Sequence, residues 1–214
     1  MRIVLCDDHR LLLEALSKAL GSQGFTVEAA TSNPADAVAA VKLFDPDLLL
    51  IDLGFPEGDG LTAAREVARS HPRTRVVVLT GSDEVAPLRE AMKIGVAGYV
   101  RKDQRLGGIV QALRQAAHGE SSIDKTLLRR LGSTAAAPTK QPQLLDRLTQ
   151  QEKVVLGCLA DGLQTSEIVK RLGIRNSTVR SHIQAILSKL GVHTRLQAVA
   201  LLNETDRRTR AVAE

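Results

Sequence analysis

Short apolar runs alternate with amphipathic stretches over the first half of the chain. The apolar runs predict five strands, at Arg2–Cys6, Phe25–Ala30, Asp47–Leu53, Arg75–Thr80 and Gly98–Arg101. Helical spacing between them predicts five helices, at Leu12–Leu20, Pro34–Phe44, Gly60–His71, Ala86–Ile94 and Arg105–His118. Leu48 to Ile51 is continuously apolar, as a strand buried on both faces should be. The alternation predicts an α/β domain over residues 1–120, with a parallel sheet covered by helices on both sides.

The pattern changes after residue 120. Residues 121–143 include a Ser-, Thr-, Ala- and Pro-rich stretch and predict a linker, with a candidate short helix at Leu127–Leu131. Residues 144–205 carry only helical patterns, punctuated by Gly162, Gly173 and Gly191. The last of these helices is expected at Thr194–Glu204, and residues 206–214 are expected to be a disordered basic tail. The sequence therefore predicts two domains of different class.

Composition separates the two halves further. The 214 residues carry a net charge of +5, but residues 1–124 hold 14 basic and 17 acidic residues, a net −3. Residues 125–214 hold the remaining 15 basic residues and 7 acidic ones, a net +8, so the second half is expected to bind a polyanion. Cys6 and Cys158 show no ligand-like spacing. Free thiols and the lack of a membrane-length apolar run lead us to expect a reduced, cytoplasmic protein with no membrane partner.

Acidic side chains follow two strands that are neighbours in the common order of such sheets. Asp7 and Asp8 come after the first strand and Asp52 ends the third, while Thr80 and Lys102 follow the fourth and fifth. Because ligands bind beyond the carboxyl ends of parallel strands, these groups are expected to converge. Three carboxylates suit Mg²⁺ or Mn²⁺, and a lysine and a hydroxyl suit phosphoryl oxygens. Asp52 is the candidate nucleophile for an aspartyl-phosphate. The alternative is that Asp7 and Asp8 only cap the helix that follows and take no part in binding or catalysis.

These residues resemble the receiver domain of bacterial response regulators, a flavodoxin-like fold. The resemblance implies phosphorylation at Asp52, and Mg²⁺ at Asp8, Asp52 and the Gly54 carbonyl, with Asp7 acting through water. It implies that Thr80 and Lys102 bind the phosphoryl oxygens. Tyr99 matches the aromatic switch that turns inward after phosphorylation, although a half-buried strand aromatic would look the same.

The basic half contains a helix-turn-helix pattern. Thr149 and Glu152 form a capping-box sequence before a helix that stops at Gly162. A short helix at Thr165–Leu172 then precedes a glycine turn and a longer helix at about Ser177–Leu190. Such a second helix can enter the major groove of DNA. On periodicity alone, a protein-binding helical bundle with a basic face is an equal alternative.

Several motifs in residues 146–202 resemble the four-helix LuxR/NarL-type output domain. They include Leu148-Thr-x-x-Glu152, Thr178-Val-Arg-x-His182 and Lys189-Leu-Gly-Val-x-Thr-Arg195. The resemblance places the helix-turn-helix at Thr165–Gln184. It implies base contacts from Arg180, Ser181 and Gln184, and phosphate contacts from Thr165, Asn176, Thr178 and Lys189. It also implies dimerisation through the last helix, which carries Leu196, Val199, Ala200 and Asn203 at helical spacing. Packing within the monomer is the alternative for these four residues.

Together the two resemblances predict a NarL/FixJ-type two-component regulator, with a sensor histidine kinase, promoter DNA, a second copy and RNA polymerase as candidate partners. An orphan regulator controlled without phosphorylation is a second hypothesis. A magnesium-dependent phosphatase is disfavoured, because Gly54 stands where haloacid-dehalogenase enzymes need a second Asp. Activity beyond slow self-phosphorylation and autodephosphorylation is not expected. A dinucleotide-binding enzyme is also disfavoured, because Asp7-Asp8-His9 replaces the glycine-rich loop.

Overall fold

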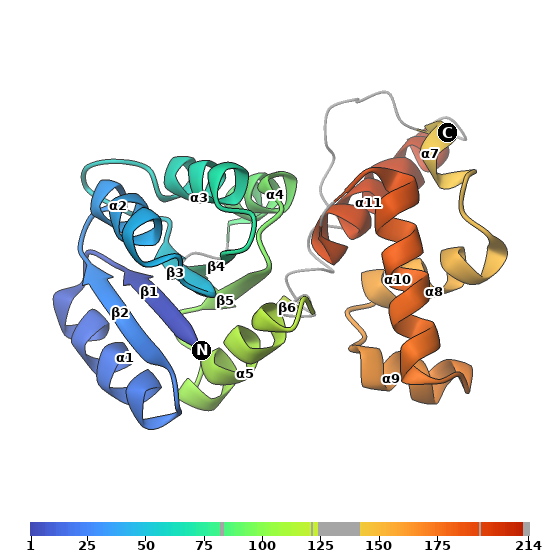
Figure 1. The fold of residues 1–214 in the computed structure, drawn as a ribbon. Helices are drawn as coiled ribbons and strands as arrows, with labels where there is room; N and C mark the ends of the chain where they lie inside the picture. The colour runs from blue at the N-terminus through green and yellow to red at the C-terminus, as the bar shows by residue number, and fades with distance from the viewer. Residues whose placement is uncertain (82–83, 121, 124–141, 193, 212–214) are drawn as a thin grey trace. The chain divides into compact units, whose positions relative to one another are not determined.

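The computed structural model describes residues 1–81, 84–120, 122–123, 142–192 and 194–211, and they form two compact units, Met1–Ser122 and Ile123–Glu214 (Figure 1). Of the predicted linker, residues 121 and 124–141, with the candidate helix Leu127–Leu131, lie outside the described residues. Each unit is treated by itself below. Among the described residues, no helix is both long and apolar enough to cross a membrane.

The first unit is a parallel sheet between two layers of helices. Its strands are β1 (Arg2–Cys6), β2 (Thr26–Thr31), β3 (Leu48–Asp52), β4 (Arg75–Thr80) and β5 (Gly98–Arg101). A two-residue strand, β6 (Ser122–Ile123), which the sequence analysis did not predict, adds to the edge at β5. The order is β2-β1-β3-β4-β5-β6, so β1 and β3 are hydrogen-bonded neighbours, with Cys6 in register with Ile51. The predicted flavodoxin-like α/β fold is confirmed.

Helices cover both faces of this sheet. They are α1 (Arg10–Ser22), α2 (Pro34–Phe44), α3 (Gly60–Ser70), α4 (Val85–Ile94) and α5 (Leu106–Ala117). In Figure 1, α1 and α5 lie on one face, and α2, α3 and α4 lie on the other. Side chains alternate between the faces along each strand. Ile3 and Leu5 therefore pack with Leu13 and Leu113 of α1 and α5, in a core of fully buried aliphatic side chains.

Local signals in the sequence fix where two of these helices, α2 and α3, start. Asn33 accepts a hydrogen bond from the Asp36 backbone N–H at 2.8 Å and caps α2, with Pro34 at its first position. Asp59 caps α3 in the same way, through the Leu61 N–H at 2.9 Å. Gly60 follows at a very close approach of two segments, because a Cβ there would lie 2.1 Å from the Asp52 carbonyl oxygen. The loop after β3 is therefore held against the end of its strand.

The second unit is helical. It contains α7 (Pro142–Leu145), α8 (Gln150–Ala160), α9 (Thr165–Leu172), α10 (Asn176–Leu190) and α11 (Arg195–Ala211). The Thr149–Glu152 capping box at the start of α8 is present. Gly173, at φ 65°, ends α9 and makes the turn into α10. Val155, Ile168, Ile183 and Ile186 are fully or almost fully buried and form part of its core.

Two boundaries in this unit differ from the prediction. Helix α7 begins at Pro142, inside the stretch predicted as linker. Helix α11 continues to Ala211, so the backbone of residues 206–211, predicted as a disordered tail, is helical. The physical reason is local: residues 195–211 contain neither glycine nor proline, and arginine and alanine are good helix formers.

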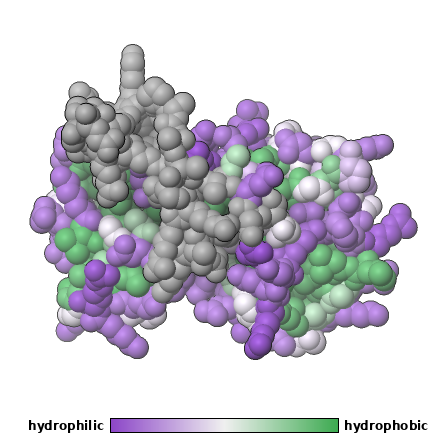
Figure 2. Space-filling view, turned by 180° about the vertical axis from the view of Figure 1, so that it is seen from behind, coloured by the Kyte–Doolittle hydropathy of each residue, from purple (hydrophilic) through white to green (hydrophobic). Residues whose placement is uncertain are grey.

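Among the coloured side chains in Figure 2, hydrophilic ones predominate, and hydrophobic areas lie between them. Elsewhere among the described residues, two large aliphatic side chains are strongly exposed, Leu11 of α1 at 84% and Leu43 of α2 at 75%. Both cysteines, Cys6 and Cys158, are free and buried. Burial raises the pKa of the Cys6 thiol to about 11, which keeps it in the unreactive protonated form at neutral pH.

Candidate functional site

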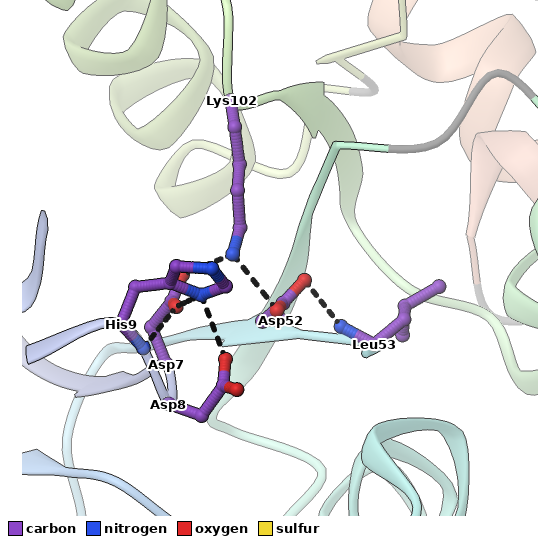
Figure 3. A network of polar contacts seen from close by, with 6 residues as sticks. All are labelled: Asp7, Asp8, His9, Asp52, Leu53 and Lys102. Carbon is purple, nitrogen blue, oxygen red and sulfur yellow. Dashed lines mark hydrogen bonds and ion pairs between the residues drawn. The ribbon is translucent and has the colours of Figure 1, made fainter. Parts of the chain in front are cut away.

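Carboxylates gather in a pit at the carboxyl ends of β1 and β3 (Figure 3). Asp7 and Asp8 follow β1 directly, and Asp52 is the last residue of β3. Asp7 and Asp52 are 1% and 4% exposed, whereas Asp8 is half-buried. One ligand atom each from Asp7, Asp8, His9 and Asp52 lies within 4.8 Å of the others. The structure thus brings together the three acids that the sequence analysis singled out.

The Lys102 ammonium neutralises part of this charge. Its Nζ forms ion pairs with Asp7 Oδ2 at 2.7 Å and Asp52 Oδ2 at 2.8 Å. The backbone brings the lysine there, because the Lys102 N–H donates to the Thr80 carbonyl at 2.7 Å beside paired strands β4 and β5. Burial alone would lower the pKa of Lys102, but hydrogen bonds with Asp52 and Asp7 outweigh it and raise the pKa. The lysine therefore stays charged.

The Asp52 side chain is held in place by a backbone contact. Its Oδ1 accepts a hydrogen bond from the Leu53 N–H at 2.8 Å, while Oδ2 faces Lys102. Gly54 lies close by, since a Cβ at this position would be 3.9 Å from Asp52 Oδ2. Close-set hard oxygen ligands with few other donors fit Mg²⁺ or Mn²⁺. The donor set therefore suits a divalent cation.

Two further predicted residues lie on the strands beside the pit, Thr80 on β4 and Tyr99 on β5. Thr80, the last residue of β4, is buried at 3% exposure. Tyr99 of β5 is 1% exposed, so its ring already lies inside the protein. Burial raises the pKa of the Tyr99 phenol, and the neighbouring Thr80 side chain partly offsets that rise. The Thr80 side chain and the Tyr99 phenol thus lie close together.

His9 is a residue of the pit that the sequence analysis missed. Its Nδ1 lies 2.8 Å from Asp8 Oδ1 and 3.1 Å from Asp7 Oδ1 (Figure 3). Its backbone N–H also donates to Asp7 Oδ1 at 2.9 Å. A signal was available, because His9 directly follows the acidic pair and imidazole is a common metal ligand.

The helix-turn-helix of the second unit presents a polar face on α10. Asn176, Arg180, Ser181 and Gln184 are exposed, and Thr178 is half-buried. Ser177 is also exposed, four residues before Ser181 and therefore on the same side of the helix. Sequence reasoning omitted Ser177, although the helical spacing indicates it. This face can offer hydrogen-bond donors and acceptors to the edges of bases.

Two predicted phosphate contacts have partners inside the unit. Thr165 is 2% exposed, and its hydroxyl accepts a hydrogen bond from Arg195 Nη1 at 3.0 Å. Lys189 Nζ lies 2.8 and 2.7 Å from the two carboxylate oxygens of Glu152. The ion pair with Lys189 lowers the pKa of Glu152. It also joins the end of α10 to the start of α8. Both side chains therefore hold helices together in this structure.

The last helix also packs inward. Leu196 and Val199 are 2% and 3% exposed and belong to the core of the helical unit, as the monomer alternative requires. Ala200 and Asn203 are half-buried. Of the four positions predicted to pair two copies, two are thus covered within one copy.

A doubly wound sheet with an acidic pit at its carboxyl edge, followed by a helix-turn-helix unit, defines a two-part regulator. The response regulator receiver domain family matches residues 3–114, and the bacterial regulatory proteins of the luxR family match residues 146–202. The chain therefore belongs to the response regulators whose receiver domain precedes a LuxR-type domain. The resemblance found in the sequence is confirmed.

Individual relatives match along almost the whole chain. The uncharacterized transcriptional regulatory protein YxjL of Bacillus subtilis is 30% identical, with 93% of both chains covered. The DNA-binding transcriptional activator DevR/DosR of Mycobacterium tuberculosis is 28% identical, with 97% of this chain and 96% of that protein covered. The RcsB response regulator of Salmonella typhimurium shares the fold, with a TM-score of 0.58, 24% identity, and coverage of 94% of this chain and 98% of the other.

Proposed function

We propose that this chain is a phosphorylation-controlled transcription regulator that accepts a phosphoryl group on Asp52 and binds promoter DNA as a dimer. The observation that carries the proposal is the convergence of Asp7, Asp8, Asp52 and Lys102 in one pit. A sensor histidine kinase is the proposed phosphodonor. The regulation of transcription by relatives such as DevR/DosR supports the output function.

The pit would perform the phosphoryl transfer as follows. Asp8, Asp52 and the Gly54 carbonyl would hold Mg²⁺ or Mn²⁺, with Asp7 acting through water. The bound cation would neutralise charge on the phosphoryl oxygens. An Asp52 carboxylate oxygen attacks phosphorus and forms an oxygen–phosphorus bond, while the leaving group departs with the electron pair of the bond that breaks. Lys102, already 2.8 Å from Asp52 Oδ2, then binds a phosphoryl oxygen.

Thr80 and Tyr99 would pass the change on. The Thr80 hydroxyl would donate a hydrogen bond to the new phosphoryl group. Because the Thr80 side chain lies close to the buried phenol of Tyr99, a shift of Thr80 would alter the surroundings of Tyr99 on β5. A charge change at Asp52 would in this way bias two arrangements of the receiver surface.

The helical unit would read DNA through α10. Arg180, Ser181 and Gln184 are the proposed base contacts, and Asn176 and Thr178 are the proposed phosphate contacts. Ser177 extends the same exposed face. The internal partners of Thr165 and Lys189 argue against a direct role for their side chains. The net charge of +8 in residues 125–214 favours association with the phosphate backbone.

Intact mass spectrometry tests the phosphorylation step. Full-length protein with Mg²⁺ and acetyl phosphate should gain the mass of one phosphoryl group, and Asp52→Asn should not. Glu66→Gln, which removes an exposed carboxylate on α3, is the matched control and should behave like wild type. No mass gain in wild type would favour the orphan regulator, and an equal gain in Asp52→Asn would place the phosphoryl group elsewhere.

A further inference from the structure

His9 occupies the position before the first turn of α1 but does not cap the helix. That position usually carries a Ser, Thr, Asp or Asn whose oxygen accepts a backbone N–H of the first turn. The His9 side chain makes no such bond. Its ring instead faces Asp7 and Asp8 at the mouth of the pit, with 67% of the side chain exposed (Figure 3). The acids therefore orient the imidazole, and most of its side chain is exposed to solvent.

The spacing of these atoms matches the ligands of a single ion. In octahedral coordination with bonds of about 2.1 Å, neighbouring ligand atoms lie about 3.0 Å apart and opposite ones about 4.2 Å apart. His9 Nδ1 is 2.8 Å from Asp8 Oδ1 and 3.1 Å from Asp7 Oδ1. The set that also includes Asp52 fits within 4.8 Å. Little movement separates this arrangement from a coordination sphere.

The charges also favour a cation at this point. Lys102 pairs with Asp7 Oδ2 and Asp52 Oδ2, on the inner side of the pit. Asp7 Oδ1 and Asp8 Oδ1 converge instead on one ring nitrogen of His9. A neutral imidazole has a single N–H, which at best both oxygens share. A metal ion, in contrast, can bind Asp7 Oδ1, Asp8 Oδ1 and His9 Nδ1 at the same time.

We propose that His9 is a nitrogen ligand of the pit and makes this receiver bind first-row transition ions, such as Co²⁺ and Zn²⁺, in preference to Mg²⁺. The inference rests on the proposed metal site and adds a donor to it. Mg²⁺ prefers oxygen ligands and gives up water reluctantly, whereas imidazole suits zinc and its neighbours. The choice of ion then depends on a residue next to the acids, and not on the acids alone.

Metal titration of the tag-free full-length protein tests this directly. Binding of Co²⁺ and Mg²⁺ is measured by calorimetry, and the visible absorption of Co²⁺ reports nitrogen ligation. His9→Ala should weaken Co²⁺ binding about tenfold or more and shift the Co²⁺ bands, with Mg²⁺ affinity changed by less than about twofold. His9→Gln, which keeps a polar side chain, should behave like His9→Ala. His118→Ala, at an exposed histidine after α5, should match wild type.

Three results would overturn the inference. Wild-type Co²⁺ affinity in both His9 variants would remove the ring from the ligand set. Equal losses of Co²⁺ and Mg²⁺ binding would mean that His9 only orients the acids. An equal loss in His118→Ala would indicate adventitious surface binding. Phosphorylation is scored separately with Mg²⁺: failure to modify Asp52 while Co²⁺ still binds through His9 would refute the proposed function and leave this inference standing.

Discussion

The ion pair between Lys189 and Glu152 favours a structural role for this lysine over a contact with DNA. Glu152 is the more deeply placed partner, with 6% of its side chain exposed against 36% for Lys189. Besides both contacts with Lys189 Nζ, Glu152 Oε2 accepts the Thr149 N–H at 2.7 Å. Removal of the ammonium would leave a nearly buried carboxylate with only its capping bond. We therefore predict that Lys189→Met destabilises the helical unit.

The size of this effect follows from the exposure of the pair. A hydrogen bond to a charged group contributes about 1.5–3 kcal/mol, and breaking a fully buried ion pair costs about 3–5 kcal/mol. Because more than a third of the Lys189 side chain is exposed, solvent screens the pair and the lower range applies. A loss of about 2 kcal/mol raises the opening equilibrium of α8 and α10 roughly 30-fold. Hydrogen exchange of the full-length protein, resolved by mass spectrometry, measures this change in those helices.

A double-mutant cycle isolates the pair. Glu152→Gln removes the charge but keeps an oxygen that can accept the Thr149 N–H. Lys189→Met combined with Glu152→Gln should cost less than the sum of the single changes, with a coupling of about 1–2 kcal/mol. Lys153→Met, at an exposed lysine of α8, is the control and should leave exchange unchanged.

The DNA-binding role makes the opposite prediction. If Lys189 contacts a phosphate, Lys189→Met should weaken binding to all sequences and reduce the salt slope by about one. The exchange of α8 and α10 would then stay as in wild type. That combination of results would refute the structural assignment and restore the contact predicted from the sequence.

Three further predictions each concern a single residue. Gly60→Ala should destabilise the receiver by about 1–3 kcal/mol and slow phosphorylation, because its Cβ would meet the Asp52 carbonyl; Gly21→Ala, with nothing within 4 Å, should not, as thermal unfolding and mass spectrometry can check. Arg180→Ala should cost about 1–3 kcal/mol at a cognate site and less at unrelated DNA in gel shifts; equal losses would make Arg180 a phosphate contact. The lowered pKa of Glu152 contributes stability above its usual pKa of 4.5, and this stability is lost as pH falls through the folded value. Protection of α8 should thus decline at acid pH in wild type more than in Glu152→Gln, measured by hydrogen exchange corrected for intrinsic rates.

The sequence predicted the receiver well, because its information is local. The buried strands β1 and β3 are apolar from Ile3 to Cys6 and from Leu48 to Ile51, so Asp7 and Asp52 mark the ends of these strands directly. Topology then brings the ends together, since β1 and β3 are neighbours in the sheet. To predict the acidic pit from the sequence pattern, only the usual strand order of such sheets was needed in addition.

The partners of individual polar side chains could not be predicted in this way. Lys189 and Glu152 are 37 residues apart in the sequence, and Thr165 and Arg195 are 30 apart. Residues this far apart lie on different helices, so the spacing within one helix does not predict their contact. Both pairs depend on how α8, α9, α10 and α11 pack. A lysine or threonine near a helix end looks the same in sequence whether it faces DNA or a neighbouring helix.

The balance of charge distinguishes the Lys102 cluster of the first unit from the Lys189 cluster of the second. Lys189 meets one carboxylate, which also completes a capping box, so that cluster is neutral and its polar atoms have partners. Lys102 meets two carboxylates in a pit that holds three, so the carboxylates outnumber the ammonium and the pit keeps an excess of negative charge. Such a charge at low exposure is costly unless a divalent cation can enter. The same side-chain chemistry therefore joins two helices in one unit and forms the proposed cation site in the other, and the number of carboxylates around each lysine accounts for the difference.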